Sequence, residues 1–137
     1  MLKEFIHRLP KVELHVHLEG SIQPATLLEL ARRNGVMLPA DDVTGLQRWY
    51  RFTDFNHFIK IYLTISSCIC TPEDIELIAR DFLRGQAEQN IVYSEVTFTP
   101  YTHFSTNRCI PFDEQLEALT RARTWAAREL NVNCGWV

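Results

Sequence analysis

Strand-like and helix-like segments alternate along this chain, and their order limits the fold more than any other feature of the sequence. Residues 12–18 alternate between apolar and polar side chains, residues 91–99 are rich in β-branched and aromatic residues, and residues 131–137 begin a third strand-like run. Helical stretches separate these runs. Because strands that alternate with helices are typical of β/α units around a parallel sheet, the sequence predicts an α/β fold.

Capping residues mark where the helices begin and end. Pro24 suits a first helical turn, and Asn34 with Gly35 closes the short helix that follows. Thr71 is a good N-cap residue, and Pro72 after it begins a second helix. A third helix follows Pro111, with an apolar stripe formed by Phe112, Leu116, Leu119, Ala122, Ala126 and Leu130.

The composition fits a globular protein and argues against several partners. Of the 137 residues, 46% are hydrophobic, and 14 basic and 17 acidic residues leave a net charge of −3 without a long block of one sign. We therefore expect no nucleic-acid partner. The sequence has neither a stretch of 18 apolar residues nor a signal peptide, which predicts a cytoplasmic protein without a membrane partner. The four cysteines lack paired spacing and are expected to be reduced thiols packed as small apolar residues.

Two histidines stand in the first strand-like run. Side chains two residues apart on a strand lie on the same side, about 7 Å apart, so His15 and His17 can converge on one metal ion. Zinc accepts imidazole nitrogen at about 2.0–2.1 Å. The alternative is a half-buried antiparallel strand with a solvated polar face. Strict alternation predicts one face with Glu13, His15, His17 and Glu19, and another with Val12, Leu14, Val16 and Leu18.

Residues 9–21 (LPKVELHVHLEGS) resemble the N-terminal signature of the adenosine deaminase family, within the amidohydrolase superfamily. The resemblance continues through residues 31–35, 71–74 and 92–96, and so covers essentially the whole chain. It implies a (β/α)8 TIM barrel of the metal-dependent hydrolase type. Because the chain ends on an uncovered third strand, we expect residues 1–137 to be a single partial domain, the N-terminal part of such a barrel with about three strands.

The resemblance also implies roles for individual residues. His15 and His17 would be two ligands of one zinc ion, with His17 beside the substrate as well. Glu19 corresponds to an acidic position that hydrogen-bonds the sugar of a nucleoside. The segment between the first two strands would form a helical lid over the substrate. Its apolar stripe is Phe55, Phe58, Ile59 and Tyr62, for which the alternative is plain core packing.

The implied activity is zinc-dependent hydrolytic deamination of a small-molecule 6-aminopurine nucleoside, with adenosine as the first candidate. Glu19 and Thr97 depart from the Asp and Arg of many members, which favours 6-aminodeoxyfutalosine or adenine as alternative substrates. A non-catalytic binding module is the alternative from another class. The chain has no His-Gly-x-Glu segment and none of the later catalytic groups, so we expect it to be inactive alone. His103 follows the second strand, where a barrel enzyme exposes residues to its active site, but it is interpreted as a loop histidine. The sequence predicts no oligomeric state.

Overall fold

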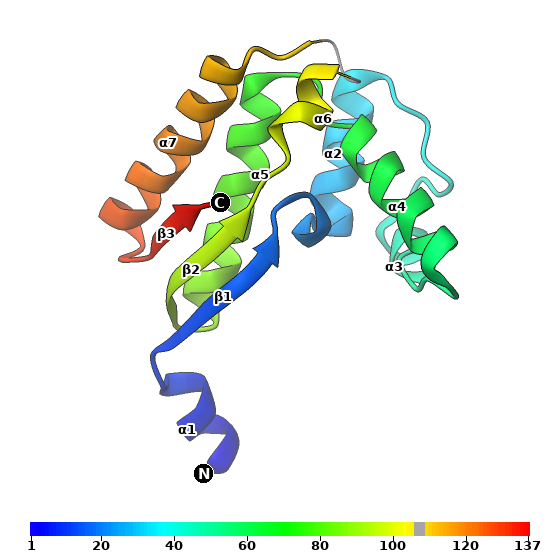
Figure 1. Ribbon diagram of the computed structural model, residues 1–137. Coiled ribbons are helices and arrows are strands. Elements are labelled where there is room, and N and C mark those ends of the chain that lie inside the picture. Colours follow the sequence, from blue (N-terminus) through cyan, green and yellow to red (C-terminus); the bar gives the residue numbers. More distant parts are fainter. Residues whose placement is uncertain (106–108) are drawn as a thin grey trace.

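Three parallel strands form the sheet of this protein (Figure 1). The computed structural model describes residues 1–105 and 109–137. The strands are β1 (Lys11–His17), β2 (Ile91–Thr97) and β3 (Asn133–Trp136), and they lie in the order β1-β2-β3. The parallel pairing confirms the predicted α/β fold and shows that the antiparallel alternative for the first strand is wrong.

The three predicted helices are confirmed, together with their caps. Helix α2 (Pro24–Asn34) ends at Gly35, whose φ of 66° is a left-handed conformation that glycine adopts readily. Helix α5 (Pro72–Glu88) begins with a capping box in which Thr71 and Asp74 each bond the other's backbone. Helix α7 (Phe112–Glu129) follows Pro111. Helix α5 packs on β2 and on α7, which packs on β3, so the two helices cover the same face of the sheet (Figure 1).

Shorter elements lie around the sheet. A 3-10 turn, η1 (Glu19–Ser21), directly follows β1, and the helical segment with the predicted aromatic stripe is α4 (Phe55–Ser67). Both α4 and its neighbour α3 begin after an aspartate N-cap, Asp54 and Asp42 respectively. The elements that the sequence did not predict are α1 (Leu2–Arg8), α3 (Val43–Trp49) and α6 (Pro100–Ser105), in addition to η1.

The core lies between the sheet and the helices, and it corrects two details of the sequence prediction. Helix α7 buries Gln115 in place of Phe112 and Leu116, which are largely exposed. Gln115 is tolerated there because its side-chain amide donates to the carbonyl oxygens of Ile110 (2.7 Å) and Pro100 (3.2 Å). Of the four free cysteines, Cys109 is exposed and not packed in the core as expected. None of the described helices is long and apolar enough to cross a membrane.

Candidate functional site

A register shift in β1 decides which side chains of the histidine strand share a face. Glu13 and Val16 are three steps apart in β1, but their partners in β2 are only two steps apart. An extra residue of this kind is a β-bulge, which changes the side of the sheet to which the following side chains point. The prediction that Glu13 shares a face with His15 and His17 is therefore wrong.

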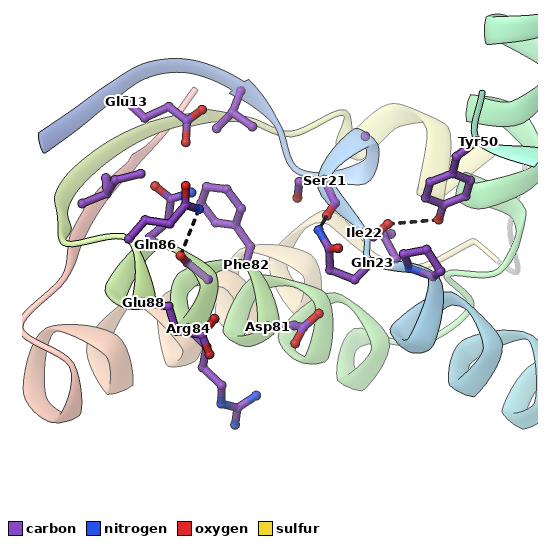
Figure 2. A pocket seen from close by; sticks show the side chains of 16 residues that line it. Glu13, Ser21, Ile22, Gln23, Tyr50, Asp81, Phe82, Arg84, Gln86 and Glu88 are labelled. Atoms are coloured by element: carbon purple, nitrogen blue, oxygen red, sulfur yellow. Dashed lines mark hydrogen bonds between the residues drawn. The ribbon is translucent and has the colours of Figure 1, made fainter. Parts of the chain in front are cut away.

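Glu13 lies on the helix-facing side of the sheet, between β1 and α5 (Figure 2). It lines a cavity of about 640 Å³ together with Phe82 and Gln86 of α5. Neither histidine of β1 lines this cavity. The two apolar side chains beside Glu13 in the sequence, Val12 and Leu14, are exposed. The chemistry that the histidine pair can supply therefore belongs to the opposite face of β1.

His15 and His17 lie next to each other at the C-terminal end of β1. Their ring centroids are 5.3 Å apart and the ring planes are nearly perpendicular, at 87°. Two imidazoles that bind one tetrahedral zinc ion at about 2.0–2.1 Å place their ring centres about 5 Å apart. The pair thus fits two ligand positions of one zinc ion. Within residues 1–105 and 109–137, no cluster of three or more His, Cys, Asp or Glu could hold a metal ion.

A cavity of about 510 Å³ begins at His17 and extends below α4. From the strand ends it is lined by His17 and Thr99, and by Gly20 of η1. Three further walls are side chains of α4, namely Phe58, Ile59 and Tyr62. The structure therefore brings one of the two predicted metal ligands and three of the four predicted stripe residues to the same cavity.

The fourth stripe residue, Phe55, does not line this cavity. It is 72% exposed and stacks on Phe58, with the ring centroids 6.2 Å apart. Helix α4 buries a different face, which includes Ile61 and Ile65. Phe55, Phe58 and Ile59 are exposed apolar side chains in this chain, so core packing of the stripe also stays a prediction. Their role as a lid over a ligand stays a prediction.

Glu19 is wholly buried, two residues after His17. Its Oε1 accepts a hydrogen bond from the backbone N–H of Thr99 (2.9 Å) and lies 3.2 Å from Nε2 of His103. Burial raises the pKa of Glu19, but the hydrogen bonds from His103 and from backbone N–H groups outweigh burial and hold the pKa below its usual value. Glu19 is thus a buried carboxylate, and its predicted contact with a sugar stays a prediction.

Tyr62 connects this carboxylate with the cavity. Burial raises the pKa of the Tyr62 hydroxyl, the hydroxyl of Thr99 opposes this by hydrogen bonding, and the negative charge of Glu19 raises the pKa further. Because Tyr62 and Thr99 both line the cavity, the Glu19 carboxylate lies just behind its polar wall.

His103 differs from its prediction. It was interpreted as a loop histidine, but it lies in α6, is completely buried and contacts Glu19. Its place after β2 is the signal in the sequence that points to the site, since residues at the C-terminal ends of parallel strands meet at one edge of a sheet. Its ring also stacks on Phe98, with the centroids 5.1 Å apart.

Comparisons with known proteins show which family this chain belongs to. The model of the family described as "Adenosine deaminase" matches residues 10–136. An adenine deaminase of Bordetella parapertussis is 37% identical over 134 residues, which are 98% of this chain and 42% of that protein. An aminodeoxyfutalosine deaminase of Streptomyces avermitilis is 40% identical over 135 residues, 98% of this chain and 37% of that protein.

A solved structure shows the same fold. It is an amidohydrolase from Burkholderia ambifaria with bound zinc, which superposes with a TM-score of 0.85 at 24% identity and covers 98% of this chain and 36% of that one. The architecture here is that of the first strands and helices of a (β/α)8 barrel. The chain spans about two fifths of the length of these two relatives. The family match over nearly all of its residues shows that this chain belongs to the adenosine deaminase family.

Proposed function

We propose that this chain is part of a zinc-dependent hydrolase that deaminates a 6-aminopurine. The observation that carries the proposal is the histidine pair at the end of β1, whose ring spacing of 5.3 Å fits two ligands of one zinc ion. One member of the pair, His17, lines a cavity. In the reaction, water and the 6-aminopurine give a 6-oxopurine and ammonia. Zinc held by His15, His17 and groups outside this chain would supply activated water at the cavity.

The residues of this chain bind the substrate and exclude water from it. Phe58 and Ile59 offer an apolar surface to a flat purine ring, and closing such a surface over the ligand removes water from the reaction. Tyr62, Thr99 and the Glu19 carboxylate behind them provide the polar groups that orient the ligand. The described residues include no further group that we assign to proton transfer, so we expect the 137-residue chain alone to be inactive.

The names of the relatives support two substrates. Adenine is the substrate implied by the Bordetella protein, and aminodeoxyfutalosine is implied by the Streptomyces protein. Adenosine, the first candidate from the sequence, remains a third. All three carry the 6-amino group on a purine, so the same chemistry serves each. We place adenine first among them.

The test is deamination by the full-length protein. Each of the three substrates is assayed by the ultraviolet change that accompanies loss of the 6-amino group, and zinc is measured in the same preparation. We expect turnover of at least one substrate and about one zinc per site. No turnover of any substrate would reject the proposed function.

A variant pair tests the metal ligands. His15→Ala combined with His17→Ala removes two imidazole ligands, and we expect both zinc content and activity to be lost. The matched control is His7→Ala, an exposed histidine on α1. Stoichiometric zinc and full activity in the double variant would show that the metal is bound elsewhere.

A further inference from the structure

The strongest unassigned feature of the structure is the buried pair of Glu19 and His103. The two residues are 84 positions apart in the sequence, and both side chains are almost completely inaccessible to solvent. Burying a carboxylate is unfavourable unless hydrogen bonds compensate the lost hydration. The contact therefore replaces water around Glu19.

The hydrogen-bonding roles in this pair follow from its geometry. Oε1 of Glu19 already accepts the backbone N–H of Thr99 at 2.9 Å, so it acts as an acceptor toward Nε2 of His103 as well. Nε2 must then carry the proton. The stack of the imidazole on Phe98, with the ring planes 14° apart, holds the ring in the plane needed to donate. His103 thus holds Oε1 of the Glu19 carboxylate in place.

The other oxygen, Oε2 of Glu19, is also buried and has no hydrogen-bond partner within the described part of the chain. Buried polar atoms in native proteins nearly always have a partner. Glu19 does not itself line the 510 Å³ cavity, but two residues next to it do: Gly20 follows it in the sequence, and Thr99 donates to its other oxygen. A donor group of a ligand in that cavity is the partner that the arrangement lacks.

We propose that His103 is a positioning residue that acts through Glu19. By holding Oε1 in place with Nε2–H, it fixes Oε2 behind the wall that Tyr62 and Thr99 form, where Oε2 accepts a hydrogen bond from an N–H or O–H group of a substrate that reaches past this wall. This inference rests on the proposed deaminase function. A ring N–H of a free purine and a hydroxyl of a sugar are both donors, and the choice of substrate in the test distinguishes them.

Two amide substitutions test the proposal in the full-length protein. In His103→Gln the amide nitrogen lies near the position of Nε2 and can still donate to Glu19. In His103→Asn the amide nitrogen lies near Nδ1 and points away from it. We expect His103→Asn to raise KM about tenfold or more, the effect of one lost hydrogen bond to a charged group. His103→Gln should raise KM less than about threefold, and kcat should change less than KM in both variants. His7→Asn is the control on an exposed histidine.

A second readout does not depend on activity. Hydrogen exchange of residues 18–22 and 97–100 should be faster in His103→Asn than in His103→Gln, with equal zinc content in both proteins. Equal exchange in the two variants, or equal KM values, would overturn the proposal. The rise in KM for adenine against adenosine identifies the donor as a ring N–H or a sugar hydroxyl. If the wild type deaminates none of the purines, the proposed function fails alone, and the exchange measurement still decides whether His103 positions Glu19.

Discussion

Replacing Asp74 by alanine should destabilise the protein strongly. The Asp74 carboxylate is fully buried at the start of α5 and accepts four hydrogen bonds. The donors are Nη1 of Arg33 (3.0 Å), Nδ2 of Asn34 (2.8 Å) and the backbone N–H groups of Cys70 (2.9 Å) and Thr71 (3.0 Å). Asp74→Ala takes the charged acceptor away from these donors, and one hydrogen bond to a charged group contributes about 1.5–3 kcal/mol. We expect a loss of that size for Asp74→Ala.

Arg33 offers a matched control, because it also pairs with Glu29 at 3.2 Å. The Glu29 side chain is 57% exposed, whereas that of Asp74 is 0% exposed. An exposed pair contributes less than about 1 kcal/mol, so Glu29→Ala should change stability little. Urea unfolding of the full-length variants, followed by tryptophan fluorescence, measures both differences. A loss in Asp74→Ala no larger than that in Glu29→Ala would refute the argument from burial.

Two further predictions concern the lid and the effect of pH. Phe58→Ala removes a side chain that lines the cavity and should raise KM for the purine about tenfold. Phe55 lies outside the cavity, so Phe55→Ala should raise KM less than about twofold. Equal effects of the two substitutions would argue against the lid. Burial raises the pKa of Glu76, but hydrogen bonds from Arg121 and Arg80 outweigh burial and lower that pKa. The ionised Glu76 therefore stabilises the fold above about pH 4.5, and this stabilisation is lost as the pH falls further. Unfolding midpoints measured from pH 7 to pH 3 should therefore decline less steeply in Glu76→Gln than in the wild type, and parallel curves would contradict this.

Local signals in the sequence account for most of the secondary structure. Pro24, Gly35 and Thr71 mark helix ends because each relieves a local backbone constraint that does not depend on the rest of the fold. The aspartate N-caps of α3 and α4 carry the same kind of signal. The order of strands and helices then favours a parallel sheet, because parallel strands need crossover connections, which are usually helical.

The buried face of a strand or helix was harder to predict than the position of that strand or helix in the sequence. The alternation in β1 placed Glu13 with the histidines, but the bulge between Glu13 and Val16 separated them. The apolar stripe of α7 begins at Phe112, but Phe112 is exposed and Gln115 is buried. A bulge depends on how a strand pairs with its neighbour, and the buried face of a helix depends on where the helix rests, so neither can be derived from the periodicity of one segment.

For the candidate site, the sequence by itself determined the residue types and their spacing: two histidines that share one side of a strand, and an apolar helical stripe that follows them. Only the tertiary structure decided that Phe58 and Tyr62 reach the cavity beside His17 whereas Phe55 does not, and that His103 meets Glu19. The physical reason is the separation along the sequence over which each interaction acts. Caps and alternation act within a few residues, whereas the Glu19–His103 contact joins positions 84 residues apart and exists only because β1 and β2 pair in one register and bring their C-terminal ends together.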